Sequence, residues 1–123
     1  MLVVSLSSLV GCAEPAREEV ARAISPDQLV AAVLIKKMAD ATVSTPFEIY
    51  IVPVGEKVHG EPSLRGDKFE DIKLVWKEPK FLEVHYSKGR IFTFTNFWQS
   101  GNVQNFGYTV ELRLKPQRNE PSL

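Results

Sequence analysis

The sequence has few of the residues that carry metal and redox chemistry. Its 123 residues include one cysteine and two histidines, so no disulfide can form within the chain and no paired Cys or His spacing suits a metal. Net charge is also absent, because 15 basic residues balance 15 acidic ones. This balance argues against attraction of the whole chain to nucleic acid or anionic lipid. We expect no metal, no cofactor and no nucleic-acid partner.

An uncharged stretch of apolar and small residues occupies positions 2–10, before Gly11 and Cys12. It is too short to cross the roughly 30 Å of a bilayer as a helix. The order Leu9-Val10-Gly11-Cys12 resembles the lipobox of bacterial lipoproteins, in which the cysteine is acylated and the peptide bond before it is cut. The thiol takes the lipid, and the small residue before it gives the peptidase access to the bond.

The lipobox resemblance implies a domain organisation and a location. Residues 1–11 would be a signal peptide, and Cys12 would carry acyl chains, palmitate among them, that hold the protein stably in the membrane. Ala13 after the cysteine favours the periplasmic side of the outer membrane. We assign residues 12–22 to the lipidated cysteine and a tether, 23–115 to one domain and 116–123 to a flexible tail.

Most of the domain shows a period of two in hydrophobicity, which is typical of strands with one buried face. Short turn sequences separate these runs at residues 78–80, 87–90 and 99–102. The pattern predicts a single, mainly β domain: an antiparallel meander of about six or seven strands, folded as a small sandwich or curled sheet. Residues 55–71 lack the period and predict a long loop, which in a compact domain is usually functional or mobile.

Residues 25–39 are compatible with two structures. Ser25 as N-cap, Pro26 at the first helical position and Gln28 at the third would begin a helix. The same Ser-Pro-Asp sequence can be a turn between strands at 20–24 and 29–36, because valine and isoleucine favour strands. The local rules alone lean slightly towards the helix.

A wider resemblance covers residues 24–86. Ser25-Pro26-Asp27, the apolar run 29–35, Ala41-Thr42, the strand pattern 47–53 ending Val-Pro-x-Gly, and two later runs ending in Trp76 and Tyr86 resemble a group of small uncharacterised bacterial proteins, many of them lipoproteins. Gln28 stands where that group usually has glycine. The resemblance implies a strand over residues 29–36, and it implies no activity.

The sequence carries no recognisable catalytic motif. There is no Gly-x-Ser-x-Gly for a nucleophile and no glycine-rich phosphate loop, so we expect no enzyme and assign no catalytic or metal-binding residue. Aromatic residues are dense between 92 and 108, and alternating ones such as Phe92, Phe94 and Tyr108 predict core positions. Adjacent Phe97 and Trp98 must point to opposite faces of a strand, so at least one should be near the surface.

These observations favour a lipid-anchored protein of the bacterial cell envelope that binds a protein or another ligand. The predicted binding surface comprises Phe97 and Trp98 with His59 and Arg65 from the long loop. A structural or accessory subunit of an envelope complex is the alternative hypothesis. A small hydrolase is the third, and it would need His59 or His85 near a carboxylate and a serine.

The lipobox predicts that Cys12→Ser abolishes acylation and releases the chain from membranes, because no other thiol can accept the lipid. Mass spectrometry of the membrane-extracted protein tests this. Loss of residues 1–11 and a mass added at Cys12 are expected. A membrane-bound chain with a free Cys12 thiol would contradict the prediction.

Overall fold

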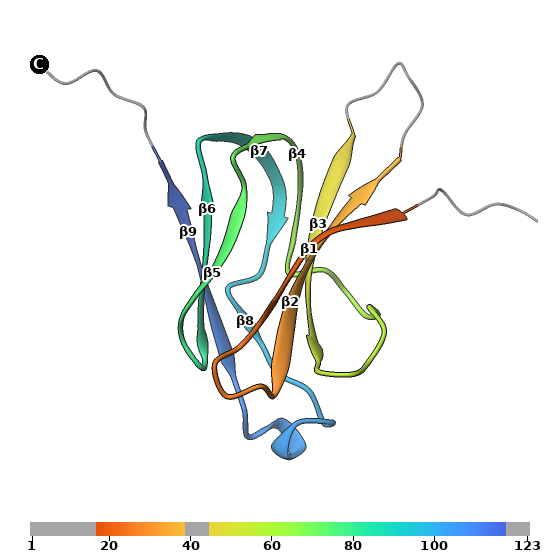
Figure 1. Ribbon diagram of the computed structural model, residues 1–123, viewed down its shortest axis with the longest axis vertical. Coiled ribbons are helices and arrows are strands. Elements are labelled where there is room, and N and C mark those ends of the chain that lie inside the picture. Colours follow the sequence, from red (N-terminus) through yellow and green to blue (C-terminus); the bar gives the residue numbers. More distant parts are fainter. Residues whose placement is uncertain (1–16, 39–44, 118–123) are drawn as a thin grey trace, which may run out of the picture.

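The computed structural model describes residues 17–38 and 45–117. Residues 1–11, the lipobox with Cys12, the Ala41-Thr42 turn and residues 118–123 lie outside this part. Within it, nine strands form two sheets, with strand orders β1-β2-β3-β4-β7 and β5-β6-β9-β8 (Figure 1). The elements are β1 (Arg17–Ile24), β2 (Val30–Lys37), β3 (Pro46–Pro53), β4 (Leu64–Glu70), β5 (Lys73–Glu78), β6 (Phe81–Tyr86), β7 (Lys88–Phe94), β8 (Phe97–Trp98), the 3₁₀ turn η1 (Gln104–Phe106) and β9 (Val110–Pro116).

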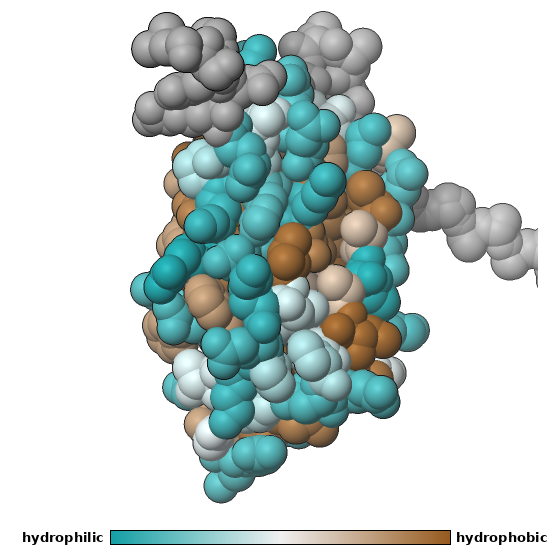
Figure 2. Space-filling model, turned by 60° about the vertical axis from the view of Figure 1, so that its left-hand side comes forward, coloured by the Kyte–Doolittle hydropathy of each residue, from teal (hydrophilic) through white to brown (hydrophobic). Residues whose placement is uncertain are grey.

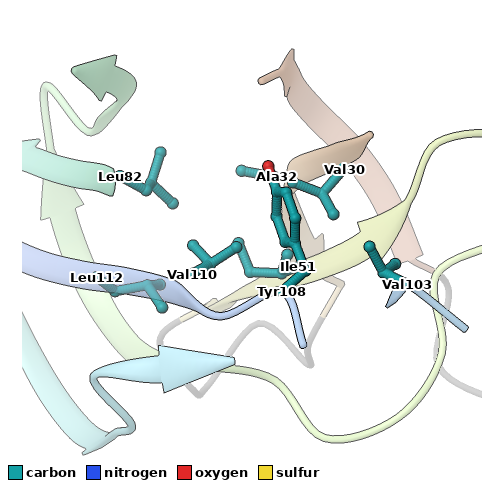
Figure 3. Packing of buried hydrophobic residues seen from close by; sticks show 8 residues of the cluster. All are labelled: Val30, Ala32, Ile51, Leu82, Val103, Tyr108, Val110 and Leu112. Atoms are coloured by element: carbon teal, nitrogen blue, oxygen red, sulfur yellow. The ribbon is translucent and has the colours of Figure 1, made fainter. Parts of the chain in front are cut away.

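The two sheets share one hydrophobic core. Side chains of Val30, Ala32 and Ile51 from the first sheet meet Leu82, Val110 and Leu112 from the second (Figure 3), and all are at most 2% exposed. Burial of this apolar area is the main stabilising contribution. The expected mainly β class, folded as a small sandwich or curled sheet, is therefore confirmed, but the described residues form nine strands and not the expected six or seven.

The chain order departs from a simple meander. Strands β1 to β4 pair consecutively and antiparallel, and β5 and β6 form the hairpin expected at Pro79. However, β7 returns to the first sheet beside β4, and β9 runs parallel to β6. Residues 88–90 are therefore not a hairpin turn but the start of β7. Two contacts hold them there: Arg90 forms a bidentate ion pair with Asp67 at 2.7 and 2.8 Å, and the Phe69 ring occupies the space beside Gly89.

Residues 30–37 form a strand, as the wider resemblance implied, and the helical alternative is wrong. Strand β2 lies between β1 and β3, and both of its faces are buried. Val30, Ala32 and Leu34 face the second sheet, while Ala31 and its alternate neighbours face the other way. A strand buried on both faces is apolar at every position, which is why its period of two is invisible in the sequence.

Residues 17–22, expected as a tether, lie in a strand of the domain. They belong to the edge strand β1, which pairs with β2 and is largely exposed. Charged residues are frequent on edge strands because they oppose further pairing, and they also conceal the strand in the sequence. The opposite sheet secures β1 through one hydrogen bond, in which the Trp76 indole N–H donates to the Ala23 carbonyl at 2.8 Å.

The long loop expected over residues 55–71 is shorter than predicted. Strand β4 occupies Leu64–Glu70, which leaves residues 54–63 as the connection. Within β4, the register shifts between Asp67 and Glu70, and Lys68 has a positive φ of 60°. A bulge of this kind breaks strict alternation, so the strand has no regular hydrophobic pattern.

The prediction that Phe92 is a core residue is wrong, and a second bulge explains why. In the β4–β7 pairing, Arg65 opposes Thr93 and Gly66 opposes Ile91, so Phe92 is the extra residue. Phe94 packs against the core and Tyr108 is 1% exposed, whereas Phe92 is 51% exposed. The extra residue turns Phe92 away from the face that Ile91 and Phe94 share.

The outward side of the second sheet is polar. The surface that carries β5, β6 and β9 is mostly hydrophilic with scattered hydrophobic residues (Figure 2).

No helix among residues 17–38 and 45–117 has the length and apolar character needed to cross a membrane.

Candidate binding site at one end of the sandwich

Three connections from both sheets meet at one end of the sandwich, the lower end in Figure 1. They are the β1–β2 turn at residues 25–29, the β3–β4 loop at 54–63 and the β8–β9 loop at 99–109. The Val54 N–H donates to the Leu29 carbonyl at 3.0 Å, which joins the first two. We call this region the loop end. Loops held by a rigid sandwich are common positions for binding residues.

A buried tyrosine fixes the loop end. The Tyr108 hydroxyl donates to Asp27 Oδ2 at 2.6 Å and lies 3.0 Å from the Pro79 carbonyl oxygen. The Ser25 hydroxyl donates to the other Asp27 oxygen at 2.6 Å. Burial, together with the Asp27 carboxylate, raises the pKa of Tyr108 to about 12, so its hydroxyl stays protonated and keeps donating. This network ties the β1–β2 turn to the β5–β6 turn and to the residue that enters β9.

The β8–β9 loop is held in an unusual backbone conformation. Gln104, Asn105 and Phe106 have φ values of 51°, 49° and 68°, in the left-handed region. For residues with a Cβ this costs about 1–3 kcal/mol each and persists only where the surroundings enforce it. Here the N–H groups of Val103 and Phe106 both donate to the Ser100 carbonyl, at 3.2 and 3.0 Å. Val103 itself is 6% exposed and belongs to the core.

A groove runs along the loop end. One part, of about 410 Å³, is lined by all three connections: Gln28, Leu29, Pro53, Val54, Glu56, Asn102, Val103 and Gln104. A neighbouring part, of about 480 Å³, shares Gln28 and Val54 and is completed by Ile24, Ser25 and Pro26. We call the two parts together the end groove. Exposed apolar side chains, Ile24 at 51% and Val54 at 43%, contribute to its surface.

A smaller concavity lies beside the short edge strand β8. This side hollow, of about 190 Å³, is lined by Glu61, Pro62, Ser63, Thr95, Phe97, Trp98 and Gln99. The structure thus brings two of the four predicted surface residues, Phe97 and Trp98, together with residues 61–63 of the β3–β4 loop. Phe97 is 51% exposed, while Trp98 packs against the core. The two adjacent side chains therefore differ in exposure as expected.

The other two predicted surface residues are not part of the side hollow. His59 is in the β3–β4 loop, where its Nε2 lies 2.9 Å from Glu56. Arg65 is in β4, not in a loop, and its side chain donates to Glu48 at 2.9 Å. His85 is on the second sheet, 2.9 Å from Glu83. Neither histidine lines the end groove or the side hollow.

Arg65 belongs to a charge cluster on the side of the first sheet that faces away from the second. Glu48, 1% exposed, accepts hydrogen bonds from Tyr50 at 2.7 Å and Arg65 at 2.9 Å, and Lys37 lies 3.4 Å away. Burial alone would raise the pKa of Glu48, but these partners outweigh it and lower the pKa below its ordinary 4.5. The cluster satisfies a buried carboxylate, which identifies it as a stabilising element.

Sequence reasoning missed Gln28, Asn102 and Gln104, the three amide side chains of the end groove. Asparagine is common in turns, and nothing in the sequence singled out Asn102 or Gln104. Gln28 stood out only as the residue at a position where the resembling group usually has glycine. Only the meeting of turns far apart in the chain places them together.

Within the described part of the chain, no group of three or more His, Cys, Asp or Glu residues could hold a metal ion.

Comparison of the sequence and the structure with protein-family models, curated proteins and solved structures finds no match. Function is therefore inferred from the geometry of the side hollow and the end groove.

The Glu48 cluster generates a pH-dependent prediction. Because the folded-state pKa of Glu48 is lowered, its contribution is present above about pH 4.5 and is lost as the pH falls through the folded-state pKa. Glu48→Gln should therefore lower the free energy of unfolding by roughly 1–3 kcal/mol at about pH 7, with a smaller loss at about pH 3. Urea unfolding at both pH values measures this. Exposed Glu18→Gln is the control, with an expected change below about 0.5 kcal/mol. A Glu48→Gln loss that grew on acidification would contradict the prediction.

Proposed function

We propose that this protein is a lipid-anchored domain of the bacterial cell envelope that binds a protein partner at the side hollow. The observation that carries the proposal is the half-exposed Phe97 at the rim of a hollow of about 190 Å³. Sites for whole small molecules usually have volumes of about 300–1,000 Å³. The side hollow is below that range and suits one anchoring side chain of a partner, with Phe97 packing beside it.

The position of β8 supports this proposal. Strand β8 is two residues long and forms the edge of the second sheet, where, among the described residues, it pairs only with β9. Its neighbour across the hollow, the segment 61–63, comes from the first sheet's β3–β4 loop. A partner that contacts both would bury Phe97 and cover an edge that is otherwise accessible.

A lipid anchor at Cys12 is compatible with a binding surface near the loop end, where the β3–β4 and β8–β9 loops both contribute to the side hollow. Residues 13–16 separate Cys12 from Arg17, so the two Cα atoms can be at most about 18 Å apart. Strand β1 then runs from Arg17 to the loop end, over about 24 Å for an extended strand of eight residues. A lipid at Cys12 would hold the start of β1 near the membrane while the loop end could point away from it.

Phe97→Ala should weaken partner binding while leaving the fold intact, because the Phe97 side chain is half-exposed. Truncating an aromatic hot-spot residue typically costs about 2 kcal/mol or more, so the dissociation constant should rise by roughly 30-fold or more. Phe92→Ala is the matched control, because Phe92 is also 51% exposed but lies in β7, outside the hollow. Full-length, lipidated variants are crosslinked in native membranes, purified and compared.

The expected result is a defined protein that wild type and Phe92→Ala recover and Phe97→Ala does not. Thermal melting of each variant excludes unfolding as the cause. Equal recovery by all three chains, or loss in both variants, would contradict binding at the side hollow.

A further inference from the structure

We propose that the end groove is a second binding site, for a neutral oligosaccharide. It is separate from the side hollow: no residue lines both. Its two parts, about 410 and 480 Å³, fall within the usual range for ligand sites. The proposal rests on the chemistry of the lining, on the backbone that presents it and on its rigidity.

The lining offers amide groups over an apolar floor. Gln28, Asn102 and Gln104 each carry a primary amide, which both donates and accepts hydrogen bonds. A sugar hydroxyl also donates and accepts, so amides and hydroxyls can pair in either direction. Leu29, Pro53 and Val54 supply apolar surface for the carbon faces of sugar rings. Polar groups placed beside apolar surface are typical of ligand sites.

The charge of the lining favours a neutral ligand. The residues of the two parts include no lysine or arginine, and their only carboxylate is that of Glu56. Glu56 already lies 2.9 Å from His59 Nε2. An acidic ligand would find no cation among these residues. An extended peptide would find little strand edge, because Ile24 is the one lining residue from the edge strand β1 and Pro53 has no N–H to donate.

Two of the three amides are held at a cost in backbone energy. Gln28 and Gln104 have φ values of 64° and 51°. Glycine would adopt these conformations without the steric cost that a Cβ brings. The chain nevertheless places long amide side chains at both positions, and both line the groove. Strained residues are concentrated at ligand sites, where the surroundings enforce a conformation that suits binding.

The walls of the groove are fixed before any ligand arrives. The Tyr108–Asp27–Ser25 network holds the wall that contains Gln28, and the hydrogen bonds to Ser100 hold the wall that contains Gln104. The Val54 N–H bonds the Leu29 carbonyl across the floor. A preformed site loses less conformational entropy on binding than a mobile loop does.

The test uses the full chain with Cys12→Ser, labelled with ¹⁵N, and follows the backbone and side-chain amide signals of Gln28, Asn102 and Gln104 by NMR. The probes are maltotriose and triacetylchitotriose as neutral trisaccharides, trigalacturonic acid as an acidic one, and tetra-alanine as a peptide. At least one neutral trisaccharide should shift these signals saturably at millimolar concentration, with smaller effects from the other two probes.

Two glycine variants separate the amide from the strain. Gln104→Gly removes both, and should weaken binding of the neutral trisaccharide by roughly fivefold. Asn105→Gly removes strain at a neighbouring residue that does not line the groove, and should change binding by less than about twofold. Both should raise the melting temperature, because glycine tolerates positive φ.

Three outcomes would overturn the proposal. They are the absence of saturable shifts with either neutral trisaccharide, tighter binding of trigalacturonic acid or tetra-alanine at these residues, and equal weakening by the two glycine variants. Equal weakening would mean that loop rigidity, and not the Gln104 amide, accounts for binding.

Discussion

The arrangement of the loop end depends on the hydrogen bond between the Tyr108 hydroxyl and the Asp27 carboxylate. These residues are far apart in the sequence, and their 2.6 Å contact joins the β1–β2 turn of the first sheet to the loop that leads into β9 of the second. The same hydroxyl lies 3.0 Å from the Pro79 carbonyl, so the β1–β2 turn, the β5–β6 turn and the β8–β9 loop meet at this buried hydroxyl. Because an unpaired buried polar group is costly, the network favours a single arrangement of these turns.

That fixed arrangement gives the two proposed sites different properties. The side hollow is small and lies beside the short edge strand β8, where the half-exposed Phe97 can pack against a partner's side chain. The end groove is larger, has amides on an apolar floor and includes strained backbone at Gln28 and Gln104. A protein-binding surface and a ligand groove can therefore lie next to each other on one scaffold without sharing residues.

Much of the fold could be predicted from the sequence because strands with one buried face alternate visibly. Strands β3, β5, β6 and β9 were recognisable in this way. Strand β2 was ambiguous because it is buried on both faces, and residues 17–22 of β1 were assigned to a tether because four of the eight residues of this exposed edge strand are charged. The bulges at Lys68 and Phe92 hid β4 and reversed the expected burial of Phe92, since an inserted residue shifts the alternation.

The candidate site was predictable only in part. Phe97 and Trp98 were identifiable because adjacent aromatics in a strand cannot both point into the core. Arg65 and His59 were assigned to the binding surface because both were expected in one long loop. Arg65 instead lies in β4, where its side chain forms an ion pair with Glu48. The end groove could not be predicted, because its walls come from residues around 28, 54 and 104, and only the tertiary fold brings these together.

The central claim is that the loop end is a rigid, prearranged surface. The most direct test is the ¹⁵N NMR order parameter of the backbone amides of Gln104, Asn105 and Phe106 in the full chain without ligand. The hydrogen bonds to Ser100 and the burial of Val103 and Tyr108 predict values of about 0.85, as in rigid backbone. Values below about 0.6 would show a flexible loop, and would contradict the claim that strain is held there to preform a site.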